Sequence, residues 1–316
     1  MMVNIFLKDQ NTYNGEIDEF VSRRYRVIAR LSKGGTSEIF KAIDTFTNSK
    51  VVIKILLPDY IHGIEKSKDE KNINFPDIPL REIEKANEFI THEAKFLETC
   101  HHPNIIHLRD YNLESQRPYI VLDFLENITL EKEILHKSRT FSIKETLDIL
   151  EQLCDALGYV HDKGFVYCDL KPNNIISIHQ NLTLIDFGLV RPIDNPILGG
   201  TIGYMAPEAL QSYNNPVLAT PALDIYSLGI LLYELLTEFH PLSYQKNNIG
   251  TDNVSAEKLM HAQAYGTPRL ASELNPYLPK VFDKILLHCI ENKPDDRYQS
   301  MDLLIQEFTL EARSFI

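Results

Sequence analysis

Three polar side chains stand at short intervals in the stretch YCDLKPNNI, which runs from Tyr167 to Ile175. Asp169 can accept a proton, Lys171 can neutralise negative charge, and Asn174 carries an amide oxygen that a metal ion can bind. An Asp-x-Lys-x-x-Asn spacing between a helix-like segment and a short apolar strand is typical of an active-site loop. The stretch therefore indicates catalysis.

Further candidates follow one another along the chain, each weak on its own. Gly34 lies in a turn between strand-like segments, Lys54 lies in a β-branched run, and Glu93 lies in a helical pattern. An Asp-Phe-Gly begins at Asp186 and an Ala-Pro-Glu ends at Glu208. An isolated strand Lys or helix Glu is usually a solvated surface residue. Six such pieces, counted together with the loop and taken in this order, argue against coincidence.

The chain from about Tyr25 to its end resembles a eukaryotic-type (Hanks-type) protein kinase, because it carries these motifs in the family's order. The segments HHPNIIHL, GTIGYMAPE and NKPDDRYQS are similar to those of bacterial Ser/Thr kinases. The resemblance implies transfer of the γ-phosphoryl group of ATP to Ser or Thr hydroxyls of protein substrates. The implied cofactors are ATP and Mg²⁺, with Mn²⁺ as an alternative.

The resemblance also implies catalytic roles for particular side chains. Lys54 would hold the α- and β-phosphates and pair with Glu93. Asp169 would accept the proton of the attacking hydroxyl, Lys171 would neutralise the transferred group, and Thr201 would contact both. The implied metal ligands are Asn174 and Asp186.

The implied ATP-binding positions are Ser32, Gly34, Gly35, Ser37, Ile39, Val52, Lys54, Leu122, Asp123, Leu125, Ile176 and Asp186. Leu122 would be the gatekeeper beside adenine, while Asp123 and Leu125 would offer backbone hydrogen bonds. Apolar side chains would sandwich the adenine ring, and these are Ile39, Val52 and Ile176. The family's phosphate-covering loop reads G-x-G-x-x-G, and this chain has Ser32 and Ser37 at the outer positions, which reduces its backbone freedom.

The catalytic loop departs from the family where His-Arg usually precedes the Asp, because Tyr167 and Cys168 stand there (a non-RD loop). In many members that Arg receives a phosphate placed on the activation segment, and Cys168 cannot do so. The segment 189–200 contains no Ser, Thr or Tyr. We therefore expect a kinase that is not switched by phosphorylation of this segment, with Tyr167 packed against Phe187 and Leu97.

Two further pairs implied by the resemblance are structural. Glu208 should form an ion pair with Arg297, and Asp224 should accept hydrogen bonds from the backbone of the catalytic loop. Breaking either pair should destabilise the helical part of the chain, because a buried charge without its partner is costly.

The elements that must position these residues change in kind along the chain. Strand-like segments occupy 25–31, 37–43, 50–56, 104–108 and 118–125, and a helical stripe includes Leu80, Ile83, Ile90, Ala94 and Leu97. Beyond 125 the pattern is mostly helical, with a capping box at Ser142 and Glu145 and a buried helix from Thr220. We expect an α+β, bilobal protein-kinase fold. Its parts are an extension (1–24), an N-lobe with a small antiparallel sheet and one main helix (25–125), and a larger, mainly helical C-lobe (126–316).

Composition limits the function classes. The 316 residues carry a formal charge of −12, which argues against a nucleic-acid-binding surface. No secretory signal or membrane span is indicated, so we expect a cytoplasmic protein without a membrane partner. Four scattered cysteines indicate neither a disulfide framework nor a zinc site. A polar run at 65–74 lengthens the interval between Lys54 and Glu93. The oligomeric state is not indicated.

Two alternatives remain open. A pseudokinase, which would act as a nucleotide-binding or allosteric scaffold, is favoured by the altered glycine loop and by Tyr167 and Cys168. The retained Lys, Glu, Asp and Asn residues oppose it. A small-molecule kinase of the antibiotic-phosphotransferase type usually lacks the Ala-Pro-Glu segment with its Arg partner, so Glu208 and Arg297 argue against that class.

Overall fold

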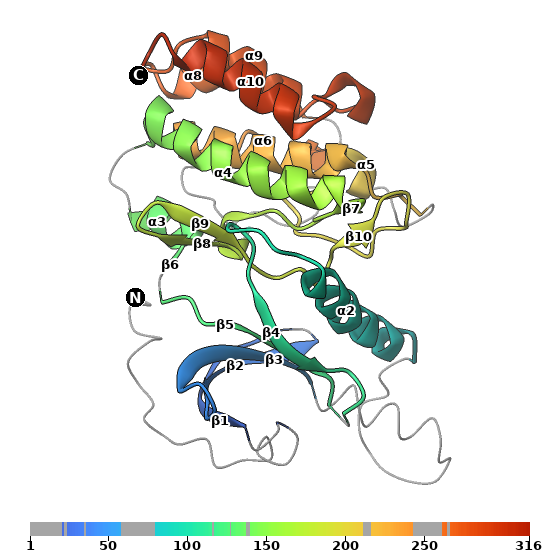
Figure 1. Cartoon of the computed structure of the whole chain (residues 1–316). Coiled ribbons are helices and arrows are strands. Elements are labelled where there is room, and N and C mark those ends of the chain that lie inside the picture. The colour runs from blue at the N-terminus through green and yellow to red at the C-terminus, as the bar shows by residue number, and fades with distance from the viewer. Residues whose placement is uncertain are drawn as a thin grey trace. The chain divides into compact units, whose positions relative to one another are not determined.

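The computed structural model describes residue 21 and the ranges 24–34, 36–57, 80–115, 117–126, 128–136, 140–210, 216–242, 261–263 and 266–316, with side chains from residue 86 onward in the first helix. The chain divides into two compact units (Figure 1). The first comprises Met1–His101 and Ile106–Leu125, and the second comprises His102–Ile105 and Glu126–Ile316. The predicted insertion at 65–74 and nearly all of the extension 1–24 lie outside the described residues.

The first unit contains a five-stranded antiparallel sheet with strand order β1-β2-β3-β5-β4. Its strands are β1 (Tyr25–Lys33), β2 (Ser37–Asp44), β3 (Ser49–Leu56), β4 (Leu108–Asn112) and β5 (Tyr119–Asp123). Alternate residues of these strands build a hydrophobic core, as expected for β-branched and aromatic runs with one buried face. That core includes Phe40, Ala42, Val51, Ile53 and Val121.

One long helix, α2 (Leu80–Glu98), packs on this sheet and contacts β3, β4 and β5. Its predicted apolar stripe is confirmed for Ile90, Ala94 and Leu97, which are buried. Leu80 and Ile83 lie in the same helix, but their side chains are outside the description.

The predicted strand at 104–108 is wrong, because β4 begins only at Leu108. Before it, Ile105 forms an isolated bridge with Leu184, and the Asn104 amide donates to the Leu182 carbonyl. These bonds lie within the second unit, to which residues 102–105 belong, so Asn104 and Ile105 do not join the sheet of the first. A run of this length does not reveal its partner from periodicity alone.

The second unit is mainly helical. Its longer helices are α4 (Ile143–Asp162), α6 (Pro221–Thr237), α9 (Val281–Cys289) and α10 (Met301–Ala312). Shorter helices are α3 (Leu130–His136), α5 (Pro207–Leu210), α8 (Ala271–Leu274) and the 3-10 turns η1 (Pro172–Asn174) and η2 (Pro294–Asp296). Its small strands are β6 (Ile128–Thr129), β7 (Phe165–Val166), β8 (Ile175–Ile178), β9 (Asn181–Leu184) and β10 (Arg191–Pro192). The expected α+β class, with an antiparallel-sheet unit and a larger helical unit, is confirmed.

Helix α6 is the centre of this unit and packs against α4 and α9 (Figure 1). Every residue from Leu223 to Thr237 is buried, as its nearly uniform apolar sequence predicts. Helix α4 begins with the predicted capping box, in which Ser142 accepts from the Glu145 backbone and Glu145 accepts from the Ser142 backbone.

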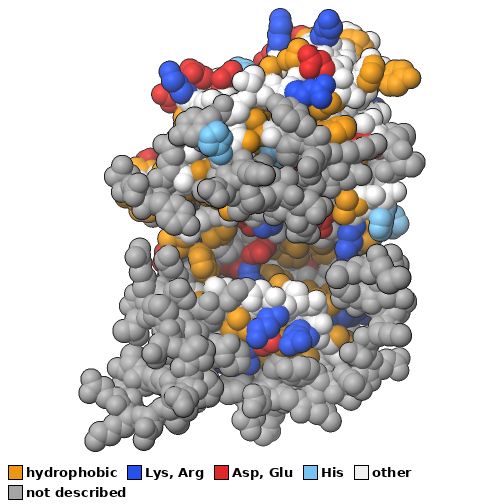
Figure 2. All heavy atoms as spheres, turned by 180° about the vertical axis from the view of Figure 1, so that it is seen from behind, with side chains coloured by type: hydrophobic (Ala, Val, Ile, Leu, Met, Phe, Trp, Pro, Cys, Tyr) orange, Lys and Arg blue, Asp and Glu red, His pale blue; other side chains and the backbone are white. Residues whose placement is uncertain are grey.

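On the face drawn in Figure 2, acidic and basic side chains of the described residues are interspersed. Among the described helices, none combines the length and the apolar character that crossing a bilayer requires.

Candidate active site

Lys54 and Glu93 form the expected ion pair in the first unit. The Lys54 ammonium on β3 lies 2.7 Å from Oε2 of Glu93 on α2, and the Glu93 side chain is 1% exposed. A carboxylate this buried requires a charged or hydrogen-bonding partner. The pair therefore fixes α2 to the sheet and holds the Lys ammonium in place.

Strand register places several predicted ATP-binding residues on one face of the sheet. Ile39 lies opposite Lys54, and Val52 lies opposite Leu122. Because side chains of directly paired residues share a face, these positions face away from the core built by Phe40. The first unit thus brings Ile39, Val52, Lys54 and Leu122 together as the resemblance implies.

Asp123 and Leu125, the predicted backbone partners of adenine, follow at the end of β5. The Asp123 N–H already donates to the His107 carbonyl at 3.1 Å, so this N–H is not free for a nucleotide. The Asp123 carboxylate accepts from Arg109 Nε. Leu125 is half-buried.

The turn between β1 and β2 carries the predicted phosphate-covering positions. The Gly34 N–H donates to the Ser37 carbonyl at 2.8 Å and closes a tight hairpin. Ser32 is exposed, Ser37 is buried, and Gly35 lies outside the described residues. A Cβ at Gly34 would meet only the Ser37 carbonyl, at an ordinary 3.5 Å. The hairpin itself therefore does not require glycine at position 34.

The second unit brings the catalytic-loop residues into one hydrogen-bonded ring. Lys171 Nζ lies 2.8 Å from Asp169 Oδ2 and 2.6 Å from Thr201 Oγ1. The Thr201 hydroxyl donates to Asp169 Oδ1 at 2.7 Å. Asn174 Nδ2 donates to both the carbonyl and Oδ2 of Asp169, each at 2.9 Å. The predicted contacts of Thr201 are confirmed.

The ring leaves particular atoms available for a ligand. Asp169 is 8% exposed, and both of its carboxylate oxygens accept hydrogen bonds. The amide nitrogen of Asn174 donates to Asp169, so its amide oxygen is the atom that could bind a metal ion. Ile176 follows on β8 and is half-buried.

Asp186, the second predicted metal ligand, is exposed and has a positive φ of 62°. Cys168 has a φ of 67°. Such left-handed backbone is unfavourable for residues other than Gly and is concentrated at functional sites. In the ranges that the structure describes, no three His, Cys, Asp or Glu residues cluster as a complete metal site. An Asn oxygen and one Asp carboxylate still suit Mg²⁺, which usually takes its other ligands from substrate phosphates and water.

Asp224 holds the catalytic loop through its backbone, as expected. Its Oδ2 accepts from the Tyr167 N–H, its Oδ1 accepts from the Cys168 N–H, both at 2.8 Å, and His161 Nε2 also lies 2.8 Å from Oδ2. Asp224 is fully buried. One carboxylate on α6 thus fixes the two residues that precede Asp169.

Tyr167 packs on Phe187 with ring centroids 4.9 Å apart in an edge-to-face arrangement, and its hydroxyl donates to the Ile185 carbonyl. This part of the predicted stack is confirmed. The Leu97 part would join the two units and stays a prediction. Burial and Asp224 raise the pKa of the Cys168 thiol well above its usual value, so its thiolate is strongly disfavoured.

The predicted ion pair between Glu208 and Arg297 is also confirmed. Arg297 donates from both terminal nitrogens to the Glu208 carboxylate, each at 2.7 Å. The same guanidinium donates to the carbonyls of Ala222 and Glu291 and lies 5.0 Å from the ring centroid of Tyr226.

A set of side chains that the sequence does not single out holds the segment just after Thr201. Gln263 accepts from the Gly203 N–H and donates to the Met205 carbonyl. His240 Nε2 lies 2.8 Å from the Gly203 carbonyl, to which it donates, and Ser227 donates to the Tyr204 carbonyl. These residues lie far apart in the chain, and only Ser227 is a visible polar interruption of an apolar helix.

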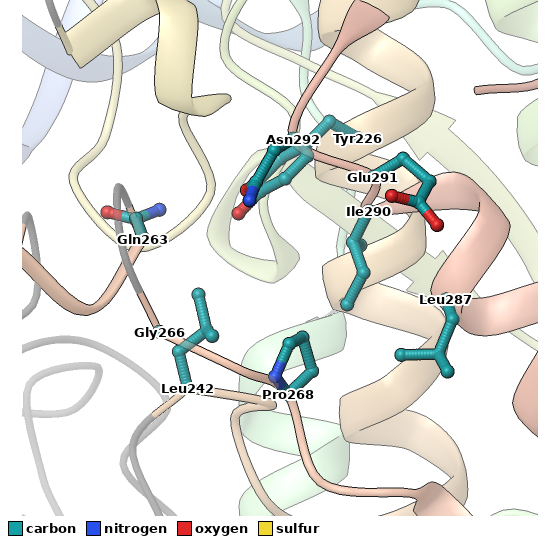
Figure 3. Close-up of a pocket in the computed structure, with 9 residues that line it drawn as sticks. All are labelled: Tyr226, Leu242, Gln263, Gly266, Pro268, Leu287, Ile290, Glu291 and Asn292. Carbon is teal, nitrogen blue, oxygen red and sulfur yellow. The ribbon is translucent and has the colours of Figure 1, made fainter. Parts of the chain in front are cut away.

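Beside Gln263 lies a pocket of about 120 Å³ (Figure 3). It is lined by Tyr226, Leu242, Gln263, Gly266, Pro268, Leu287, Ile290, Glu291 and Asn292. None of these residues was predicted as a site residue. The pocket contains no member of the Asp169 ring.

Comparisons with known proteins agree with this geometry. Residues 25–309 match the family model described as Protein kinase domain. The chain is 31% identical over 297 residues to Serine/threonine-protein kinase PrkC of Bacillus subtilis (strain 168), covering 90% of this chain and 40% of that protein. It is 25% identical over 300 residues to Probable serine/threonine-protein kinase PknB of Lactococcus lactis subsp. lactis (strain IL1403), and this match covers 92% of this chain and 42% of that protein.

The chain thus spans about two fifths of the length of these relatives. ATP and a divalent metal ion are the cofactors of this family. A family match over most of the chain coincides with the Lys54–Glu93 pair in one unit and the Asp169 ring in the other. The chain therefore belongs to the protein kinase domain family.

Proposed function

We propose that this chain transfers the γ-phosphoryl group of ATP to Ser or Thr hydroxyls of protein substrates. The observation that carries the proposal is the ring formed by Asp169, Lys171 and Thr201. In it, a carboxylate oxygen accepts a hydrogen bond from an alcohol while an ammonium group lies beside both. An attacking Ser or Thr hydroxyl and the group that it receives need the same two partners.

Each residue then has a stated task. Asp169 orients the acceptor hydroxyl and takes its proton, and Lys171 offsets negative charge on the transferred group. Lys54, held by Glu93, binds the α- and β-phosphates. Thr201 keeps Asp169 and Lys171 in register before the acceptor arrives. Positioned charge supplies most of the rate in phosphoryl transfer, because the protein does little covalent chemistry.

The proposed metal ion is Mg²⁺, held by the Asn174 amide oxygen and the Asp186 carboxylate, with Mn²⁺ as the alternative. When bound, the ion supplies charge neutralisation at the phosphates. The two hydrogen bonds from Asn174 to Asp169 orient the amide, so a change at either residue should disturb both roles. Adenine would lie against the apolar positions Ile39, Val52 and Ile176.

We further propose that the activity does not depend on phosphorylation of segment 189–200, which has no Ser, Thr or Tyr. Backbone bonds support this proposal. The segment pairs through β10 with β7, and the Ile197 N–H donates to the Val217 carbonyl at 2.9 Å. Asp194 and Asn195 exchange backbone bonds with Ala219. A segment held in this way needs no phosphate to order it.

The test is transfer of labelled phosphate from ATP and Mg²⁺ to a generic Ser/Thr protein substrate. Asp169→Asn and Lys54→Met should each lower the rate by about 100-fold or more, because each removes a group that acts in the transition state. Asp302→Asn, at an exposed position on α10, is the control and should match the wild type. A wild type that binds ATP but transfers no more than these two variants would instead support the pseudokinase, which the serines at 32 and 37 favour.

A further inference from the structure

A buried charge cluster lies in the first unit beside the turn that carries Gly34. Glu38 and Arg117 are only 6% and 3% exposed. Glu38 lies two positions before Phe40 on β2, and side chains at that spacing share a face, so its carboxylate points to the core side of the sheet. A carboxylate on that side destabilises the fold unless it is paired.

Arg117 provides that pairing and also binds the backbone at the end of β3. Its Nε and Nη2 donate to the Leu56 carbonyl at 3.0 and 2.9 Å. Its Nη2 also lies 3.3 Å from Glu38 Oε2, and Arg30 Nη1 lies 3.3 Å from Oε1 of the same carboxylate. Glu38 is thus held between two guanidinium groups, one buried and one half-exposed.

The same end of β3 supports the turn. The Leu57 N–H donates to the Thr36 carbonyl at 2.9 Å, directly after the Leu56 carbonyl that Arg117 binds. On the other side, Glu38 follows Ser37, whose carbonyl closes the hairpin on Gly34. The turn is therefore attached to the sheet at two points, and the charge cluster fixes both.

We propose that Glu38 and Arg117 are positioning residues that hold Gly34, Thr36 and Ser37 in the turn for binding the phosphates of ATP. This inference rests on the proposed function of the turn. It assigns to a Glu–Arg pair, outside the expected phosphate contacts, control over the affinity for ATP and not over the transfer step. Arg30 is the weaker, outer member of the cluster, because its side chain is half-exposed.

The first unit contains a matched control for this proposal. Arg24 donates to both oxygens of Asp44, at 2.9 and 2.7 Å, and the Asp44 side chain is 1% exposed. This pair belongs to the opposite end of the β1–β2 hairpin, since Tyr25 is paired with Asp44 in the register whereas Lys33 is paired with Glu38. Asp44→Asn therefore weakens an ion pair whose carboxylate is as buried as that of Glu38, without touching the turn.

The experiment measures KM for ATP, kcat, and the Kd for ATP by calorimetry, together with the Tm of each variant. Glu38→Gln and Arg117→Met should each raise KM and Kd for ATP by about tenfold, while kcat at saturating ATP stays within about twofold. Arg117→Lys should recover part of the affinity, since an ammonium can still donate to the Leu56 carbonyl. Asp44→Asn should lower Tm by about as much as Glu38→Gln and Arg117→Met do, but it should leave KM and Kd for ATP unchanged.

Unchanged ATP affinity in Glu38→Gln and Arg117→Met would overturn the inference, as would an equal loss of affinity in Asp44→Asn. Glu38→Gln nearly preserves side-chain volume, so it keeps the test decisive if Arg117→Met fails to fold. If the wild type binds ATP but transfers nothing, the proposed function fails while the Kd values still decide the role of Glu38 and Arg117. A wild type that binds no ATP overturns both.

Discussion

At the scale of single residues, the catalytic loop keeps its conformation with Tyr167 and Cys168 before Asp169, because Asp224 binds the backbone of these two residues and not their side chains. Asp224 accepts the N–H groups of Tyr167 and Cys168, and neither bond depends on which side chain those residues carry. Tyr167 retains the aromatic packing on Phe187 and adds a hydroxyl bond to the Ile185 carbonyl. The ring of Asp169, Lys171 and Thr201 thus forms with Tyr167 and Cys168 in the loop, and the loss of a phosphate receiver at Cys168 stays a proposal.

Asp224→Asn should destabilise the protein by about 2–4 kcal/mol, because a buried, charged acceptor of three hydrogen bonds is replaced by a neutral amide with one acceptor oxygen. Urea unfolding measures this change. Asp302→Asn, at an exposed position on α10, is the control and should change stability by less than about 0.5 kcal/mol. Equal stability of Asp224→Asn and the wild type would show that the loop is held in another way.

Glu234 gives a pH-dependent prediction. Burial raises its pKa to about 8, Tyr204 donates to its Oε2 at 2.6 Å, and the charge of Glu131 acts in the same direction as burial. Between pH 4.5, its ordinary pKa, and about 8, the unfolded chain releases this proton while the folded chain keeps it. The contribution of Glu234 to stability is therefore present below pH 4.5 and is lost as the pH rises toward 8.

Glu234→Gln should remove that contribution to the pH dependence, so its stability relative to the wild type should increase from pH 5 to pH 8. His240 acts in the opposite direction over a different window, because burial lowers its pKa to about 4 and it destabilises the fold as the pH falls below 6.5. Denaturant unfolding at several pH values measures both. A difference between Glu234→Gln and the wild type that does not change with pH would contradict this assignment.

Gly34→Ala separates folding from nucleotide binding at the turn. A methyl group there would meet only the Ser37 carbonyl at 3.5 Å, so Tm should change by no more than about 2 °C. If phosphates approach this backbone closely, the methyl group should raise KM for ATP by about fivefold or more. Thermal unfolding and ATP titration of the transfer rate check the two parts. An unchanged KM would mean that position 34 does not contact the phosphates.

At the scale of elements, α6 and α9 approach closely at one glycine. A Cβ at Gly229 would lie 2.4 Å from the Cβ of Cys289 and 2.8 Å from Cγ2 of Ile290. Real Cβ atoms do not tolerate such distances, so the helices would have to move apart. The apolar sequence of α6 predicts its burial, but it does not reveal which residue meets its neighbour.

Gly229→Ala should therefore destabilise the protein by about 1–3 kcal/mol through overpacking, although alanine favours a helix. The matched control is Gly158→Ala on α4, where the nearest atom to a new Cβ is the Met301 Cβ at 3.9 Å. That change should stabilise the protein by up to about 1 kcal/mol. Chemical unfolding compares the two. Stabilisation by both would show that α6 and α9 adjust without cost.

At the scale of the whole molecule, the order of the motifs along the chain predicted more of the candidate site than the hydrophobic periodicity of single elements did. The Lys54–Glu93 pair and the contacts of Thr201 with Asp169 and Lys171 were predicted from the resemblance, which rests on the order of the motifs. The Asp224 and Arg297 contacts were predicted in the same way. Their roles in catalysis stay proposals until activity is measured.

Other contacts could not be predicted because they join residues with no shared pattern. Gln263 and His240 meet at Gly203 from separate segments, and Arg117 meets Glu38 from another hairpin. The start of β4 was misplaced because Asn104 and Ile105 belong to the second unit, where the partner of Asn104 lies, whereas β4 belongs to the first. Such contacts depend on tertiary packing, which periodicity within one element does not encode.

The most direct test of the account is a progress curve of phosphate transfer from ATP and Mg²⁺ by protein that has first been treated with a phosphatase, which is then removed. Asp169→Asn, treated in the same way, defines the background. Because segment 189–200 has no acceptor hydroxyl and is held by backbone bonds, wild-type transfer to a Ser/Thr substrate should be linear from the first time point. Transfer no faster than Asp169→Asn, or a lag that disappears after preincubation with ATP, would contradict the account.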